Sequence, residues 1–189
     1  MKRKQWREEK VMLHHELSIE VETQCLSVWK EPWAKRFARV TLLVDFNDRF
    51  AIVMDTSNGF WFLPGGGIEQ NESIEDAAKR EATEELGLEI KINQVVETFH
   101  VTLISKETGE QLKIPPFIVV RVTPIRGQLK TEYAPNRKIV LVEKKNCKNL
   151  LQGFKVSKAY ECLKPYHYVS KEVVQQLVTS QTTKTQHTI

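Results

Sequence analysis

The order of strands and helices in this sequence predicts an α/β or α+β sandwich. Short apolar runs rich in β-branched residues occupy residues 39–44 and 51–54, and the intervening Asn47 and Asp48 are typical turn residues. An amphipathic helix is expected over residues 73–86. Because strands dominate, with helices between and after them, we expect the helices to pack on a sheet whose strand order the sequence leaves open.

Local signals support each remaining element. Ser73 is a suitable N-cap for the first helix, and Gly87 is a suitable C-terminal stop. The segment 107–110 contains a glycine and is expected to form the turn of a hairpin. The other expected elements are strands over residues 60–63, 95–104, 117–122 and 139–142, and a second helix over residues 170–178.

The composition is that of one globular domain. Hydrophobic residues make up 41% of the 189 residues, which is sufficient for a substantial core. No run of eighteen apolar residues occurs, and no apolar stretch follows the basic N-terminus, so neither a membrane span nor a secretory signal is expected. The net charge of +4 favours an anionic substrate without identifying it.

The cysteines predict a reducing compartment. Cys25, Cys147 and Cys162 are odd in number, far apart and without the spacing of metal ligands. We therefore expect a cytoplasmic protein with neither a disulfide framework nor a zinc site.

Acidic residues lie on the wrong face of the first helix. At about 100° per residue, Glu81 and Glu85 fall inside the apolar arc and Glu84 falls at its edge. An unpaired carboxylate facing the core costs several kcal/mol, so a solvated face does not explain the pattern. The apolar arc itself consists of Ile74, Ala77, Ala78, Ala82 and Leu86.

A divalent cation explains these carboxylates. Side chains three and four residues apart on a helix can converge on one point, and hard cations prefer oxygen ligands. Mg²⁺ is the expected ion, with substrate phosphates completing its coordination. Gly65, Gly66 and Gly67 precede the helix, and their backbone can approach a phosphate or a metal closely.

These residues resemble the Nudix box of the Nudix hydrolases. The box reads Gly, five residues, Glu, seven residues, Arg-Glu, an aliphatic residue, any residue, Glu-Glu, any residue, Gly, then an aliphatic residue. Ala82 at the first aliphatic slot is a mild departure that affects packing only. Seven fixed positions would match by chance on the order of once in a hundred million starts. The positions in register are Gly66, Glu72, Arg80, Glu81, Glu84, Glu85, Gly87 and Leu88.

The resemblance implies a fold, a reaction and a set of roles. The fold is an α/β/α sandwich with a mixed sheet and a loop-helix-loop box, and the reaction is hydrolysis of a nucleoside diphosphate linked to another moiety. Glu81 and Glu85 are implied as the principal metal ligands, with Glu84 assisting and the Gly65 carbonyl completing the shell. All three glutamates are candidate catalytic residues, and Glu72 and Arg80 would form a structural ion pair. Mn²⁺ is a candidate substitute for Mg²⁺.

The resemblance also suggests domain boundaries. The family's domain would cover residues 36–178, with an N-terminal extension over 1–35 and a flexible tail over 179–189. The tryptophans of the extension predict that it packs on the domain or on a second subunit.

Residues outside the box are weaker candidates. Arg39 and Trp33 belong to a segment that mixes aromatic and basic side chains, which suits either substrate binding or packing. A later carboxylate is common in the family, and Glu132, followed by Glu143, is the candidate here. His100 and Trp61 are expected to be structural.

The expected function is that of a pyrophosphohydrolase acting on a nucleotide-type small molecule. The alternative is a non-catalytic Nudix-fold nucleotide sensor or nucleic-acid-binding module, which has no need of three inward carboxylates. Nucleic acid as a partner and a homodimer are left open, and a membrane partner is not expected.

Overall fold

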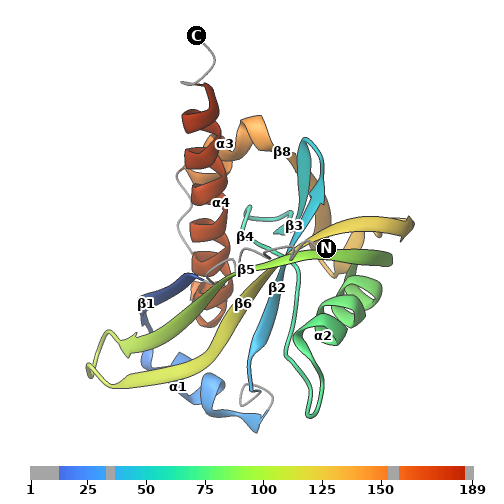
Figure 1. The fold of residues 1–189 in the computed structure, drawn as a ribbon. Coiled ribbons are helices and arrows are strands. Elements are labelled where there is room, and N and C mark those ends of the chain that lie inside the picture. Colours follow the sequence, from blue (N-terminus) through green and yellow to red (C-terminus); the bar gives the residue numbers. More distant parts are fainter. Residues whose placement is uncertain (1–12, 33–36, 153–157, 186–189) are drawn as a thin grey trace, which may run out of the picture.

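The computed structural model describes residues 13–32, 37–152 and 158–185, and in them a mixed eight-stranded sheet forms the centre of the molecule (Figure 1). The strand order is β1-β5-β6-β2-β3-β8-β7, with β4 paired to β3. The strands are β1 (Leu13–Val21), β2 (Arg39–Phe46), β3 (Arg49–Asp55), β4 (Trp61–Phe62), β5 (Leu88–Ser105), β6 (Gln111–Gly127), β7 (Glu132–Ala134) and β8 (Arg137–Glu143). The helices are α1 (Thr23–Lys30), α2 (Ile74–Glu81), α3 (Cys147–Leu151) and α4 (Lys164–Thr185), with η2 (Ala82–Leu86), η3 (Lys144–Asn146) and η4 (Lys158–Leu163) as shorter turns.

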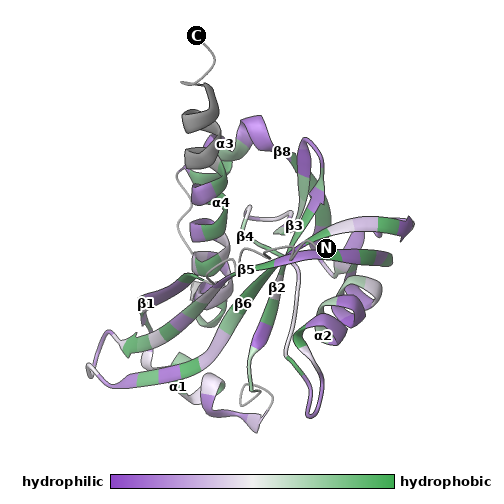
Figure 2. Ribbon diagram, viewed as in Figure 1, coloured by the Kyte–Doolittle hydropathy of each residue, from purple (hydrophilic) through white to green (hydrophobic). Residues whose placement is uncertain are grey.

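Helices cover both faces of the sheet, which confirms the expected α/β sandwich with a mixed sheet. Alternation along β2 sends Val40, Leu42 and Val44 into the core shared with α2, and Leu43 into the core shared with α1 and α4. The same alternation of hydrophobic and hydrophilic residues is visible along the outer parts of β5 and β6 (Figure 2). The two apolar layers therefore fix the register of the central strands.

The N-terminal segment is part of this fold. β1 pairs in parallel with β5, from Leu13 opposite Glu97 to Val21 opposite Ser105. The following helix α1 buries Leu26 and Trp29 in the core beneath α4. The segment expected to be an extension thus adds a strand to the sheet and a helix beside it, and this packing explains Trp29.

Several expectations need correction. The helix expected over residues 170–178 is α4, which begins at Lys164 and runs to Thr185, into the segment expected to be a tail. The sequence also gave no indication of β1, α1 and β7. Cys25 and Cys162 form a disulfide, so the expectation that the protein has no disulfide is wrong. The two cysteines are 137 residues apart in the sequence, which gave no sign of their proximity. Cys147 is a buried free thiol. No helix among the described residues is long and apolar enough to cross a membrane.

Leu26 tests whether α1 is a structural part of the domain. Leu26 is 1% exposed and Val28 on the same helix is 36% exposed. We expect Leu26→Ala to lower the free energy of unfolding by about 2–5 kcal/mol, because it leaves a cavity in the core. Val28→Ala is the matched control and should cost less than about 1 kcal/mol. Equal effects in chemical denaturation would contradict this packing.

Candidate active site

The glycine loop lies directly against β2. The amides of Val40 and Leu42 donate to the carbonyls of Gly66 and Pro64, at 2.9 and 2.8 Å. Gly65 has a φ of +139°, and a Cβ there would lie 2.2 Å from the Val40 carbonyl oxygen. Only glycine fits so close to the strand, so this backbone is held against the first residues of β2.

The second glycine leaves room for a carboxylate. A Cβ on Gly66 would lie 2.1 Å from Oε1 of Glu81, so a side chain there would displace that carboxylate. Glu81 closes the last turn of α2, where it is only 7% exposed. The inward orientation expected for this residue is therefore what the glycine loop accommodates.

The helix that carries the carboxylates begins and ends where the sequence predicts. The Ser73 hydroxyl accepts from the Asp76 amide at 3.1 Å, and Gly87 ends the helix in a left-handed conformation. Between them the last turn, Ala82–Leu86, is a π-helix. Such wide turns inside helices occur frequently at functional sites, and this one contains Glu84 and Glu85.

Arg80 joins the loop to the helix. Its Nε and Nη2 donate to the two carboxylate oxygens of Glu72 at 2.8 and 3.0 Å. The same guanidinium donates to the Gly67 carbonyl at 2.9 Å and to Oε1 of Glu81 at 2.8 Å. The carboxylate of Glu72 raises the pKa of Arg80 further above its ordinary value. This geometry is that of a structural clamp.

Glu85 lies deep beside Glu81. Burial raises the pKa of Glu85 to about 7, and the negative charge of Glu81 acts in the same direction. The Gly65 amide donates to Oε2 of Glu85 at 2.8 Å, and the Tyr133 hydroxyl donates to Oε1; both hydrogen bonds favour the charged form. Two carboxylates thus meet in one poorly solvated place.

Glu84 has a different environment. Its side chain is 60% exposed, and Oε2 lies 3.3 Å from Nη1 of Arg80. Of the three glutamates, Glu81 and Glu85 line a common cavity and Glu84 lies outside it at the helix surface. Among the described residues, no group of three or more His, Cys, Asp or Glu side chains is arranged to hold a metal ion. A cation here would therefore need ligands beyond these two carboxylates.

The cavity has a volume of about 330 Å³ and a positive wall facing the carboxylates. Arg39 is 8% exposed, and its guanidinium carbon lies 4.8 Å from the centroid of the Tyr166 ring. The guanidinium carbon of Arg137 lies 6.0 Å from the Phe62 ring centroid. The complete lining is Arg39, Phe62, Gly65, Gly66, Glu81, Glu85, Tyr133, Arg137, Leu163 and Tyr166.

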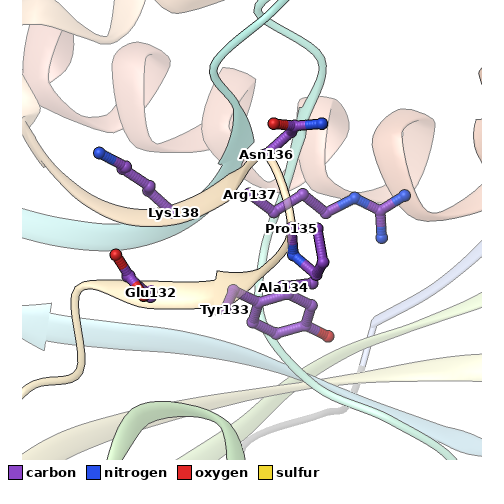
Figure 3. A pocket seen from close by; sticks show the side chains of 7 residues that line it. All are labelled: Glu132, Tyr133, Ala134, Pro135, Asn136, Arg137 and Lys138. Atoms are coloured by element: carbon purple, nitrogen blue, oxygen red, sulfur yellow. The ribbon is translucent and has the colours of Figure 1, made fainter.

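The β7–β8 hairpin supplies two cavity residues that the sequence did not reveal. Figure 3 shows Tyr133 and Arg137 on one side of the hairpin, with Glu132 and Lys138 directed to the other side. Glu132, the carboxylate proposed from the sequence, is exposed and lines a second hollow of about 440 Å³ along the hairpin, which shares Tyr133 and Arg137 with the cavity. Its neighbour Tyr133 enters the site because successive strand residues face opposite ways.

The remaining residues considered from the sequence lie away from the cavity or outside the described residues. Glu143 lies at the end of β8, 3.1 Å from Nζ of Lys145. His100 stacks on His14 away from the cavity lining, with 3.2 Å between ring nitrogens, and Trp61 is 1% exposed in the core as expected. Trp33 falls outside the described residues. The contribution of Tyr166 arises from α4, far along the chain, and no local signal indicated it.

Comparison with protein-family models matches residues 34–144 to the NUDIX domain. Over 45 residues the chain is 42% identical to the low-salt glycan biosynthesis protein Agl8 of Haloferax volcanii. That match covers 24% of this chain and 29% of the length of Agl8.

Solved structures resemble the fold. A UDP-X diphosphatase has a TM-score of 0.51 at 17% identity, over 84% of this chain and 71% of that chain. The MutT protein of Bacillus halodurans has a TM-score of 0.49 at 22% identity, over 60% and 72% of the two chains. At 17% identity the first likeness bears on the fold alone.

The role of Glu72 can be separated from catalysis by its effect on stability. Glu72→Gln breaks a bidentate pair whose side chains are 13% and 24% exposed, and should lower the free energy of unfolding by about 1–3 kcal/mol. Glu75→Gln breaks the exposed pair with Lys79, and should leave the free energy of unfolding nearly unchanged. Thermal or chemical denaturation measures both. A Glu72→Gln protein that is as stable as the wild type but inactive would make Glu72 a catalytic residue.

Proposed function

The chain belongs to the NUDIX domain family, and from this premise we propose that it hydrolyses the pyrophosphate linkage of a nucleoside diphosphate joined to another moiety, with the help of a divalent cation. The observation that carries the proposal is the cavity in which buried Glu81 and half-buried Glu85 face Arg39 and Arg137. A diphosphate with its cation has complementary charges for both walls.

Mg²⁺ is the proposed ion, with Mn²⁺ as a substitute. Glu81 and Glu85 are the proposed protein ligands, and their oxygens are the donors that hard cations prefer. The Gly65 carbonyl, substrate phosphate oxygens and water would complete the coordination, with Glu84 assisting from the helix surface. When bound, the ion would neutralise negative charge on the pyrophosphate oxygens.

The arginines are proposed to hold the phosphates. A guanidinium matches phosphate oxygens in a planar, bidentate arrangement, and stacking on aromatic rings restricts its motion. Arg39 packs on Tyr166, and Arg137 packs on Phe62 and on Tyr160, whose ring centroid is 5.6 Å from its guanidinium carbon. Water attacks one phosphorus, the bridging P–O bond breaks, and two phosphate-bearing products leave.

The reaction can be tested by a screen with Mg²⁺ over nucleotides, nucleotide sugars, dinucleotides and capped RNA. We expect a nucleoside monophosphate and the phosphate of the second moiety as products, and we expect EDTA to abolish turnover and added Mg²⁺ or Mn²⁺ to restore it. Turnover in excess chelator would contradict the metal role. Tight binding without turnover of any compound would instead make the chain a nucleotide-binding module.

The neighbouring glutamates of the π-helical turn provide a matched pair of variants. Glu85→Gln removes a ligand charge inside the cavity and should lower kcat by about 100-fold or more. Glu84→Gln makes the same chemical change at a side chain that is 60% exposed, and should lower kcat by less than about tenfold. Glu81→Gln should resemble Glu85→Gln.

Initial rates across a Mg²⁺ titration, together with Mn²⁺ binding followed by electron paramagnetic resonance, measure these differences. Weakened Mn²⁺ binding is expected for the Glu81 and Glu85 variants. If Glu84→Gln is the most damaging of the three, the assignment of the ligands is wrong.

A further inference from the structure

The position of Arg39 depends on a tryptophan that lies outside the matched family domain. Its guanidinium carbon lies 5.8 Å from the centroid of the Trp29 ring, in addition to its contact with Tyr166. Trp29 belongs to α1, ahead of residues 34–144, and it is 2% exposed. Trp29 and Tyr166 are also in ring contact, with centroids 5.8 Å apart. Arg39 therefore packs on a platform of two aromatic rings, Trp29 from α1 and Tyr166 from α4.

A covalent bond fastens the two halves of this platform. Cys25, one helical turn before Trp29, forms a disulfide with Cys162 of η4. The Trp29 indole Nε1 donates to the Cys162 carbonyl at 2.9 Å. Cys162 directly precedes Leu163, which lines the cavity, and Tyr166 follows one turn later. The disulfide thus restrains α1 and the cavity wall at their point of contact.

We propose that Trp29 is a positioning residue, which holds the Arg39 guanidinium for a phosphate of the substrate, and that the Cys25–Cys162 disulfide keeps it in place. Reduction of the disulfide then weakens binding of the diphosphate. The inference rests on the proposed function, because it assigns Arg39 to a substrate phosphate. In the reduction, a dithiol gives two electrons and two protons, the S–S bond breaks into two thiols, and the dithiol becomes a disulfide.

Reduction of the disulfide should weaken substrate binding without unfolding the protein. β1 pairs with β5 over its whole length, and Leu26 anchors α1 in the core, so the sheet should stay folded after reduction while the Trp29 end of α1 is less restrained. Arg39 contacts a phosphate in the ground state and in the transition state alike. Loss of such uniform binding raises KM and leaves kcat nearly unchanged.

The redox arm uses the full chain and methylenediphosphonate, a non-hydrolysable diphosphate, with Mg²⁺ in isothermal titration calorimetry. Thiol titration after denaturation should find one free thiol in the oxidised protein and three after dithiothreitol. We expect about tenfold weaker binding after reduction, the order of one charge-assisted hydrogen bond. Cys147→Ala should respond to dithiothreitol as the wild type does. The double variant Cys25→Ala with Cys162→Ala should bind weakly in both conditions.

The positioning arm compares aromatic residues of the same core. Trp29→Leu should weaken methylenediphosphonate binding about tenfold and raise KM, with kcat within about twofold of wild type. Trp29→Phe retains a ring and should recover much of the affinity. Phe99→Leu removes a ring that stacks on His15, and should lower the melting temperature without weakening binding.

The outcomes separate this inference from the proposed function. If the oxidised wild type binds methylenediphosphonate, but dithiothreitol and Trp29→Leu leave its affinity unchanged, the inference is overturned and the proposed function stands. Three free thiols in the oxidised protein, or equal losses of affinity in Trp29→Leu and Phe99→Leu, also overturn it. If the wild type neither binds the probe nor hydrolyses any compound of the screen, both fail.

Discussion

The arrangement of the site depends on the hydrogen bonds that the Arg80 guanidinium donates. This guanidinium is shared by Glu72 and the Gly67 carbonyl on the loop and by Glu81 on the helix. Because a planar guanidinium presents its donors in fixed directions, these contacts set the distance between loop and helix. The glycine loop is held from the other side by its backbone bonds to β2. The carboxylates therefore occupy a rigid frame, which suits a site that must be organised before its substrate arrives.

This frame accommodates one buried and one half-buried carboxylate at a cost in electrostatic energy. Glu81 and Glu85 repel each other, and burial raises the pKa of Glu85 to about 7. Hydrogen bonds from Gly65, Tyr133 and Arg80 offset part of this cost. A purely structural role does not explain why such groups face a cavity, because an apolar pair of similar volume would pack there without the penalty. Under the proposed function, a bound cation relieves the remaining repulsion between the two carboxylates.

The sequence predicted features that depend on neighbouring residues, and it did not predict contacts between distant parts of the chain. The helix with its Ser73 cap, its Gly87 stop and its inward Glu81 follows from spacing along one element, and it was predicted correctly. Tyr133 was missed by one residue, because the side of a short strand on which a residue lies depends on hydrogen bonding to β8. Tyr166 and the Cys25–Cys162 pair join distant parts of the chain, and a single sequence holds no record of such contacts.

The two walls of the cavity have different origins in the chain. The carboxylates and Gly66 lie within the box and Gly65 directly precedes it, whereas the arginines and aromatic rings come from β2, β4, the β7–β8 hairpin and the start of α4. The first wall is the one that a sequence motif encodes. Under the proposed function the arginines of the second wall bind the phosphates, and the aromatic rings of that wall hold the arginines. Arg39 is rigid because Trp29 and Tyr166 hold it, and a rigid cation rejects a ligand whose anionic group is displaced. The strand and helix that precede the family domain therefore belong to the same physical system as the site.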